Sequence, residues 1–192
     1  MMYDLRKYCN QISPLQEKTW EALKQVFKTS QLKKGDFFVT EGQVTRKFAF
    51  LSEGVIRAFY QNNEGIEYNR NFFTNASFIG NYSSLITGKP SLHAQQALTN
   101  CQLYIGDYDA LINLYDNYPD LERFARKFAE NYFVKYEQKE IEIIFSNADK
   151  RYITFQEQYP NLIQLIPQYH IASYLGISPT QLSRIRKKNT HH

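Results

Sequence analysis

The sequence predicts an α+β protein with an N-terminal antiparallel β-barrel or jelly roll, a long helix and a C-terminal helix-turn-helix. Three observations predict this order. Short apolar runs broken by glycines fill residues 31–105, an apolar stripe at helical spacing runs through 118–145, and a second helical pattern precedes a basic end. We therefore expect a β-domain with an N-terminal helix at 1–117, a long helix at 118–146 and a helix-turn-helix domain at 147–192.

Length and composition favour a globular protein. A chain of 192 residues with 43% hydrophobic content can form one large domain or a medium and a small one. No apolar run approaches the roughly 18 residues of a membrane span, and the first residues contain no signal-peptide core. We therefore predict a cytoplasmic protein without a membrane segment. Cys9 and Cys101 are isolated, which argues against a disulfide framework.

The first predicted element is a helix that starts at Ser13. Ser13 can cap the helix, Pro14 can take the first helical position, and Gln16 can complete a capping box. We expect this helix to continue to about Phe27.

The strands of the β-domain are predicted between turn signals such as Lys34-Gly35-Asp36 and Ser52-Glu53-Gly54. They are rich in β-branched and aromatic residues, which favour strands. A small barrel would close the edges of such strands. The expected strands are Phe37–Val39, Phe48–Leu51, Val55–Tyr60, Tyr68–Phe73 and, less regularly, Ala94–Ile105.

The long helix carries apolar residues at three- and four-residue steps. They are Leu121, Phe124, Phe128, Tyr132 and Phe133, and the stripe continues with Tyr136, Ile141, Ile144 and Phe145. At 1.5 Å per residue the helix would span about 40 Å, which is longer than a small barrel requires. Either the stripe is wholly buried on its own domain, or it also pairs with a second copy of the chain. We favour the second interpretation, a homodimer. We expect a break at Asn147-Ala148-Asp149, as a hinge into the C-terminal domain.

The C-terminal pattern predicts two short helices across a tight turn. Ile171, Leu175 and Ile177 would fill the angle between them. Ser178 is a natural N-cap and Pro179 a natural first helical residue, so the second helix should extend from Pro179 to Lys188. Leu182 and Ile185 should face the first helix.

The charge of the chain is concentrated at this end. No acidic residue follows Glu157, whereas Arg184, Arg186, Lys187 and Lys188 supply four positive charges, as many as the whole formal excess of +4. A basic cluster of this kind is typical of an element that contacts phosphates. The alternative is a solvated basic tail.

Double-stranded DNA is the partner that the second helix suits best. Arg184 could pair with guanine, Gln181 with adenine, and Thr180 with a thymine methyl group or a phosphate. Contacts with phosphates would fix the register without reading the sequence. The candidate DNA-binding residues are Ser178, Pro179, Thr180, Gln181, Ser183, Arg184, Lys187 and Lys188.

Enzyme motifs are missing from the sequence. Only His93 and His170 precede the terminal histidine pair, and no His-x-His pair precedes it. The sequence also lacks a phosphate-binding glycine-rich loop and a Gly-x-Ser-x-Gly turn. We therefore predict neither catalysis nor a bound metal or cofactor.

Three stretches carry a family resemblance, and together they span most of the chain. They are Leu32-Lys33-Lys34-Gly35-Asp36-Phe37, Phe50-Leu51-Ser52-Glu53-Gly54-Val55-Ile56-Arg57 and Ile171-Ala172-Ser173-Tyr174-Leu175-Gly176-Ile177-Ser178. In this order they resemble the cyclic-AMP receptor protein and fumarate-nitrate regulator (Crp/Fnr) family of bacterial transcription factors. The resemblance implies a cyclic-nucleotide-binding-like β-domain, a homodimer on an inverted-repeat operator, and RNA polymerase as a further partner.

The same resemblance locates an effector pocket, whose sequence has diverged. Members that bind cyclic nucleotides hold the ribose with a carboxylate after a Phe-x-Gly sequence, and the cyclic phosphate with an Arg-Ser or Arg-Thr pair. Here Asn81 follows Gly80, and Ser91-Leu92 stands at the place of the pair. The candidate pocket residues are Phe78, Gly80, Asn81, Tyr82, Ser91 and Leu92.

A buried cyclic phosphate without a guanidinium partner would lose its charge-assisted bonds, which disfavours cyclic AMP. A different small molecule, or no effector, remains open. Pro179 stands where the family often has a base-reading arginine, so the operator should differ from that of well-known members. A second interpretation is a ligand-binding regulatory module whose C-terminal helices dock a protein partner instead of DNA.

Overall fold

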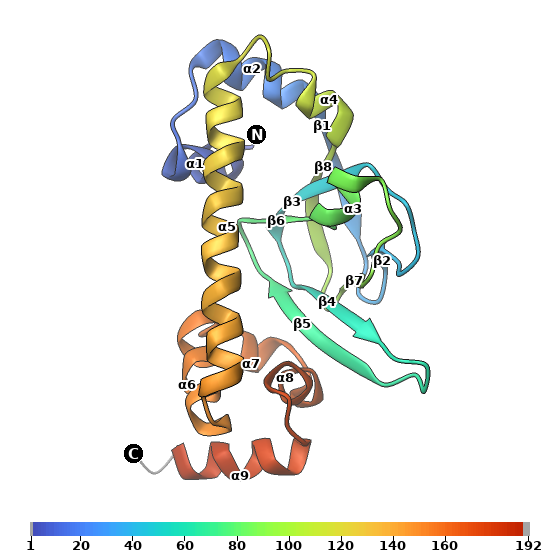
Figure 1. Ribbon diagram of the computed structural model, residues 1–192, viewed down its shortest axis with the longest axis vertical. Helices are drawn as coiled ribbons and strands as arrows, with labels where there is room; N and C mark the ends of the chain where they lie inside the picture. Colours follow the sequence, from blue (N-terminus) through green and yellow to red (C-terminus); the bar gives the residue numbers. More distant parts are fainter. Residues whose placement is uncertain (1, 190–192) are drawn as a thin grey trace. The chain divides into compact units, whose positions relative to one another are not determined.

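The computed structural model describes residues 2–189, which form two compact units (Figure 1). The first unit comprises the chain up to Ala58 together with Phe72–Phe133. The second comprises Phe59–Asn71 and the chain from Val134 onward. The chain thus passes from one unit to the other more than once, and the sequence suggests boundaries at 117/118 and 146/147 instead.

Two antiparallel β-sheets form the centre of the β-domain. One sheet has the strand order β1-β8-β3-β6 and the other β2-β7-β4-β5, so the sheets are open and the predicted closed barrel is wrong. Strands β2 and β6 are only three residues long, which leaves little backbone to pair around a full circle. The strands are β1 (Phe27–Leu32), β2 (Phe37–Val39), β3 (Lys47–Glu53), β4 (Ile56–Gln61), β5 (Glu67–Phe73), β6 (Ser77–Ile79), β7 (Ala94–Ala97) and β8 (Cys101–Asp107).

Aromatic rings fill the core of the first unit. Phe50 on β3 is fully buried, and its ring lies edge-on to Phe78 at 5.2 Å between centroids. Phe48 packs in the same way against Phe27 at 5.4 Å. Gly106 makes room for this pair, because a Cβ atom at that position would lie 2.6 Å from the Phe48 ring. Large rings therefore occupy the space that the glycine leaves.

The N-terminal region differs from its prediction. It contains two helices, α1 (Tyr3–Ile12) and α2 (Glu17–Val26), and Ser13 ends α1 instead of capping a helix that starts there. A residue remote in the sequence stabilises the start of α2. Asp120 accepts hydrogen bonds from the Gln16 amide and the Thr19 hydroxyl, both at 2.8 Å. Asp120, which is remote in the sequence, therefore has the capping role that was predicted for Ser13.

Helix α5 (Pro119–Phe145) is the long helix expected from the sequence. Leu121 and Phe124, near its start, are buried in the core of the first unit. From Asn131 onward most of its side chains are exposed, and Phe145 reaches 81%. The two parts of α5 therefore have different surroundings.

The second unit is helical apart from the hairpin of β4 and β5. Asn147 caps α6 through a bond from the Lys150 amide at 3.0 Å, which confirms the predicted break after α5. None of the described helices is both long and apolar enough to span a bilayer. The helices after α5 are α6 (Ala148–Gln158), α7 (Leu162–Leu165), α8 (Gln168–Leu175) and α9 (Pro179–Asn189).

A short turn joins α8 to α9. Gly176 ends α8 in the left-handed conformation, with φ of 67°, a geometry that glycine adopts without strain. Ser178 begins α9, where its hydroxyl accepts a bond from the Gln181 amide at 3.2 Å. Leu182 and Ile185 are buried, as predicted. The observed α9 extends one residue beyond the predicted helix.

Candidate functional site

The loop after β6 forms a small polar centre in the first unit. Asn81 caps helix α3 (Tyr82–Thr87) by accepting bonds from the Ser84 amide at 3.2 Å and the Ser83 hydroxyl at 2.8 Å. Its amide nitrogen donates to the Ser91 hydroxyl at 2.6 Å and lies 3.3 Å from His93 Nδ1. Ser91 in turn donates to the His93 carbonyl at 2.7 Å.

This polar centre is buried and largely satisfied by its own members. Asn81, Ser91 and His93 are all nearly inaccessible to solvent. The exception is Gln95, whose amide donates to the Gly80 carbonyl at 3.1 Å while its buried Oε1 has no hydrogen-bond partner among the described residues. A ligand that used Asn81 or Ser91 would have to displace existing bonds.

Arginine does occur in this domain, but it is engaged elsewhere. Arg57 on β4 is buried and donates from Nε and Nη2 to Gln96 Oε1, at 3.0 and 2.7 Å. No sequence signal identifies Arg57 as a buried residue, because nothing in its neighbours distinguishes it from a surface arginine on a strand.

An apolar pocket of about 130 Å³ lies beside the polar centre. Gly80 and α3 border it, together with residues from β1, β3, α4 (Tyr108–Ile112) and the first half of α5. None of its lining side chains is charged. The lining residues are Leu23, Phe27, Phe48, Phe73, Phe78, Ile79, Gly80, Tyr82, Leu85, Tyr108, Leu111, Tyr115, Leu121, Phe124, Ala125, Phe128, Ala129 and Tyr132.

Burial and neighbouring tyrosines raise the pKa of two tyrosines in this lining. Burial raises the pKa of Tyr115, and the nearby Tyr108 and Tyr82 hydroxyls raise it further. Burial and Tyr82 likewise raise the pKa of Tyr108. Among residues 2–189 none of these three hydroxyls has a hydrogen-bond partner. The pocket is therefore apolar along most of its wall and carries neutral phenol groups close together.

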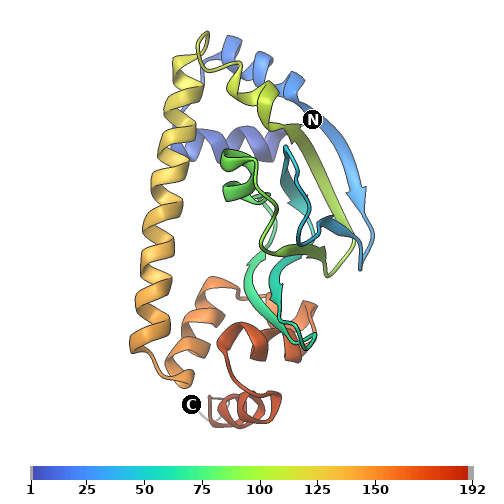
Figure 2. The same ribbon diagram turned by 45° about the vertical axis from the view of Figure 1, so that its right-hand side comes forward.

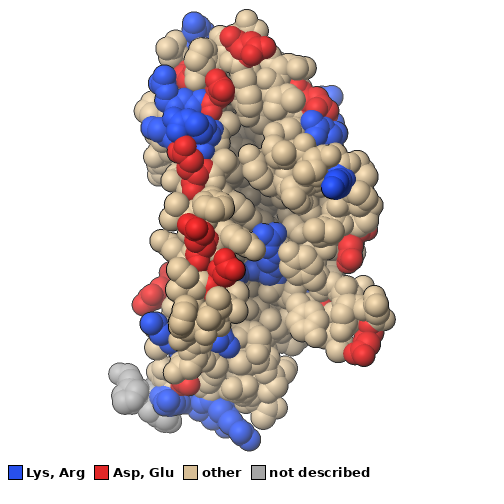
Figure 3. Space-filling view, viewed as in Figure 1, with Lys and Arg blue, Asp and Glu red and all other residues tan. Residues whose placement is uncertain are grey.

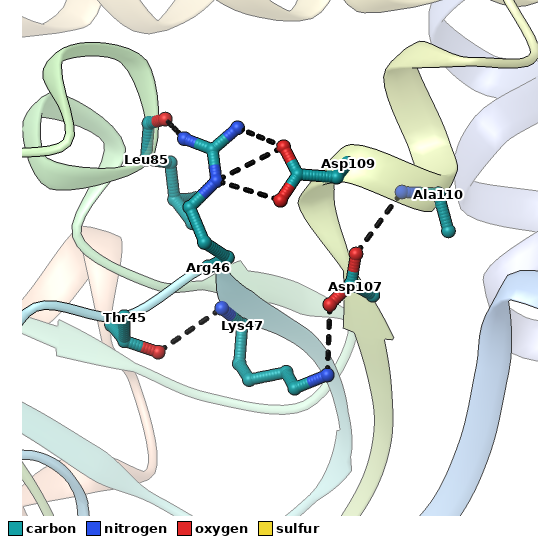
Figure 4. Close-up of polar contacts among 7 residues, drawn as sticks. All are labelled: Thr45, Arg46, Lys47, Leu85, Asp107, Asp109 and Ala110. Atoms are coloured by element: carbon teal, nitrogen blue, oxygen red, sulfur yellow. Dashed lines mark hydrogen bonds and ion pairs between the residues drawn. The ribbon is translucent and has the colours of Figure 1, made fainter.

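Two ion pairs lie at the start of α4, next to this pocket (Figure 4). Arg46 Nε lies 3.0 Å from Asp109 Oδ2, and its Nη1 donates to the Leu85 carbonyl. Lys47 Nζ lies 2.8 Å from Asp107 Oδ2. The Arg46 bond holds the pKa of Asp109 below its usual range. Both cations are therefore neutralised by neighbouring carboxylates.

The predicted effector residues consequently separate into three groups. Phe78, Gly80 and Tyr82 line the apolar pocket. Asn81 and Ser91 belong to the polar centre. Leu92 is 69% exposed and is not among the residues that line the pocket.

The predicted DNA-binding residues share one surface. Lys and Arg side chains gather over α9 (Figure 3). Lys188 is paired there with Asp149 of α6 at 3.1 Å, whereas Arg184 and Lys187 extend into solvent. The exposed residues are Ser178, Pro179, Thr180, Gln181, Ser183, Arg184, Lys187 and Lys188.

The predicted dimer residues are all turned toward their own chain, where they line the apolar pocket. Leu121 and Phe124 are buried in their own chain, and the Phe128 ring lies 5.4 Å from the Phe78 ring. Tyr132 is 41% exposed but also lines the pocket. A different set of apolar side chains is exposed on the second half of α5, namely Phe133, Val134, Tyr136, Ile141, Ile143, Ile144 and Phe145.

The hairpin of β4 and β5 supports α8 inside the second unit (Figure 2). The Asn69 amide donates to Ser173 Oγ at 3.0 Å, and its side chain donates to the His170 carbonyl at 2.9 Å. Ser173 donates in turn to the Glu67 carbonyl at 2.9 Å. The sequence offers no signal for these bonds, because their partners are about 100 residues apart.

Lys139 is enclosed in the same unit. Its ammonium donates to the Arg70 carbonyl and lies 4.0 Å from the centre of the Tyr174 ring. Burial, assisted by the Arg70 charge, lowers the pKa of Lys139 from 10.5 to about 8. The charge of Glu142 acts in the opposite direction and raises the pKa of Lys139.

We expect Lys139 to make stability depend on pH. Between about pH 8 and the ordinary lysine value, the unfolded chain binds more protons than the folded chain, so the free energy of unfolding should rise with pH. Lys139→Met should remove this rise. Thermal unfolding of both proteins from pH 7.5 to 9.5 measures the difference, and parallel curves would contradict the expectation. Lys135→Met, at an exposed position on the same helix, is the control.

Comparisons with known proteins agree with this architecture. Residues 29–118 match the family model of the cyclic nucleotide-binding domain. No curated protein matches the sequence.

Solved structures with the same fold include regulators from several bacteria. The c-di-GMP responsive global regulator CLP of Xanthomonas campestris is 14% identical over 92% of each chain, with a TM-score of 0.70. FixK2 from Bradyrhizobium japonicum is 14% identical over 85% of this chain and 84% of its own, with a TM-score of 0.72. A putative regulator of the Crp/Fnr family from Eubacterium rectale is 15% identical over 91% and 83%, with a TM-score of 0.69. The resemblance to Crp/Fnr regulators is thus confirmed at the level of the fold.

Proposed function

We propose that this chain is a Crp/Fnr-type transcription regulator that reads an inverted-repeat operator in double-stranded DNA as a homodimer, and that its effector pocket does not bind cyclic AMP. The observation that carries the proposal is the exposed basic face of α9, on a helix whose other face is buried against α8. The proposal places the protein in the bacterial cytoplasm, with RNA polymerase as a further partner.

The short turn between α8 and α9 supports the proposal of a helix-turn-helix. In this motif the second helix enters the major groove, and its N-terminal residues contact base edges. Thr180 and Gln181 lie in the first turn of α9, and Arg184 follows one turn later. All three are exposed, while Leu182 and Ile185 hold the helix from behind. The base-reading roles of Thr180, Gln181 and Arg184 follow from this placement.

Phosphate contacts would come from the lysines at the end of α9. Lys187 has no ion-pair partner within the described part of the chain, so it is available to a phosphate. Lys188 would exchange its pair with Asp149 for a phosphate contact. Each phosphate neutralised releases counterions, which makes the affinity depend steeply on salt.

The polar centre argues against cyclic AMP. A cyclic phosphate needs charge-assisted hydrogen bonds when it is buried. Asn81 and Ser91 already bond to each other at 2.6 Å, and neither carries a charge. Arg57 is committed to Gln96.

The second half of α5 supplies the proposed dimer surface. Since an α-helix turns 100° per residue, Phe133, Val134, Ile141 and Ile144 fall within about 100° of one another around its axis. Leu121, Phe124 and Lys139 lie on the opposite side. An exposed apolar stripe of this width fits a copy of itself related by a two-fold axis.

The experiment that tests this function is a randomised-site selection from a DNA library, followed by Arg184→Ala. We expect the selected sites to be inverted repeats. The variant should lose its preference at one base pair per half-site, at a cost of about 1–3 kcal/mol. Lys187→Gln should instead weaken binding to all sequences and reduce the salt dependence.

Arg126→Ala is the matched control, because Arg126 is an exposed arginine on α5, paired with Glu130 at 2.6 Å. It should leave the sequence preference unchanged. Unchanged discrimination by Arg184→Ala would contradict the base-reading role. Failure to enrich any sequence, with no salt-dependent DNA binding, would favour a protein partner for α8 and α9.

A further inference from the structure

We propose that the apolar pocket of the first unit binds a neutral small molecule of about the size of one aromatic ring, bearing a single hydrogen-bonding group. This names the chemical class of the effector and so takes its regulatory meaning from the proposed function. The binding itself concerns the first unit alone, and it can be measured without DNA.

The size of the pocket sets the size of the ligand. Its volume is about 130 Å³. An engineered cavity of roughly 150 Å³ lined by aliphatic and aromatic side chains stays dry and binds benzene. A purine nucleotide needs several times this space. The pocket therefore suits one ring with a short substituent.

The small residues on α5 keep the pocket open. Ala125 and Ala129 line it one helical turn apart on α5, and the rings of Phe48 and Phe78 belong to the same lining. Larger side chains at these two positions would fill the volume without breaking the helix, because leucine is a good helix former. The open space thus depends on two side chains that can be changed separately.

The electrostatics of the pocket favour a neutral ligand. No lining side chain is charged, and Arg46, which lies 4.8 Å from the centre of the Tyr108 ring, is already shared between Asp109 and the Leu85 carbonyl (Figure 4). An anion would enter an apolar wall without a free counter-charge, which costs far more than the transfer of a neutral ring. A carboxylate or phosphate on the ligand would therefore prevent binding.

The hydrogen-bonding group of the ligand is expected at the tyrosines. Tyr82, Tyr108 and Tyr115 line the pocket, and their hydroxyls have no hydrogen-bond partner among the described residues. Burial keeps Tyr108 and Tyr115 in their neutral form, so each hydroxyl can donate or accept. A hydroxyl or carbonyl group on the ligand would satisfy one of them.

Isothermal titration calorimetry with three probes of one size tests the proposal: benzyl alcohol, toluene and benzoate. We expect benzyl alcohol to bind, toluene to bind more weakly, and benzoate to bind at least tenfold more weakly than benzyl alcohol. Tyr115→Phe should weaken benzyl alcohol about two- to tenfold and leave toluene unchanged, because one hydrogen bond is lost. Tyr3→Phe, at an exposed position on α1, is its control.

A second set of variants tests the proposal by filling the pocket with larger side chains. Ala129→Leu should weaken benzyl alcohol at least tenfold, and Ala125→Leu replaces it if that protein does not fold. Ala110→Leu makes the same change at an exposed position of α4 outside the pocket, and it should bind like the unmodified protein.

Three outcomes would overturn the proposal: no binding of any probe at millimolar concentration, equal affinity for benzoate and benzyl alcohol, or full affinity in a folded Ala129→Leu protein. The titrations contain no DNA, so these failures leave the DNA-binding proposal standing. Conversely, a failed operator selection leaves the titration result unaffected.

Discussion

Replacing Ile141 and Ile144 with glutamate should leave the chain monomeric and lower its affinity for the operator by at least about a hundredfold. Both side chains are more than half exposed on the second half of α5. Glutamates there would place four carboxylates in the proposed dimer surface, where they would be buried without counter-charges. A monomer also loses the gain in affinity from binding two half-sites on one DNA molecule.

Sedimentation equilibrium measures the oligomeric state, and electrophoretic mobility shift with the selected operator measures the affinity. Ile153→Glu combined with Leu165→Glu is the control, because it adds the same charges at exposed apolar positions on α6 and α7. A glutamate variant of α5 that remains a dimer would place the interface elsewhere. Phe128, a member of the predicted stripe, is less suitable for this test, because a charge there would also disturb the pocket, which Phe128 lines.

Leu182→Ala should lower the local unfolding free energy of α8 and α9 by about 2–5 kcal/mol. The side chain of Leu182 is fully buried, and its helix α9 packs against α8 and α6. Its removal leaves a cavity that the short helices cannot fill without losing contacts. Because α9 would no longer be held in one orientation, operator binding should fall as well.

Native-state hydrogen exchange of the α8 and α9 amides measures this effect directly, and it does not require the whole chain to unfold in one step. Leu165→Ala, at a half-exposed position in α7, is the matched control and should change protection little. Unchanged protection in Leu182→Ala would mean that α9 is held by its ion pair with Asp149 rather than by its core.

The sequence predicted the elements whose signals are local. The limits of β2 are those expected, α5 starts within one residue of its prediction, and α9 begins at Pro179 as the Ser-Pro signal indicates. Alternation and turn residues also located most strands of the two sheets. Each of these signals lies within a few residues of the element that it defines.

The features that were missed depend on residues remote in the sequence. Ser13 has the local pattern of a cap, but Asp120 provides stronger bonds to the start of α2, so the tertiary contact decides where the helix begins. The closure of a barrel depends on pairing between the edge strands of the two sheets, which no local pattern encodes. The strand β6 is too short for an alternation signal.

The same difference between local signals and contacts of remote residues applies to the candidate sites. The exposed face of α9 could be predicted, because the positions of Leu182 and Ile185 fix the orientation of a short helix. The effector pocket could not, since its walls combine α3 and α4 with rings from distant strands. Gly80 and Asn81 were recognised from their motif, yet Asn81 turned out to serve the polar centre and not the apolar pocket.

The second unit is made of two separate stretches of the chain, so its helices cannot be moved to another protein as one continuous segment. Asn69 and Glu67 lie in the middle of the chain, and both bond to Ser173 of α8. A fragment that begins at residue 147 would lack these partners, as well as Lys139. Recombination at a single crossover point would therefore give a chimera with an unsupported α8. A functional transplant of the C-terminal helices onto another sensor needs the hairpin Phe59–Asn71 to be transferred together with them.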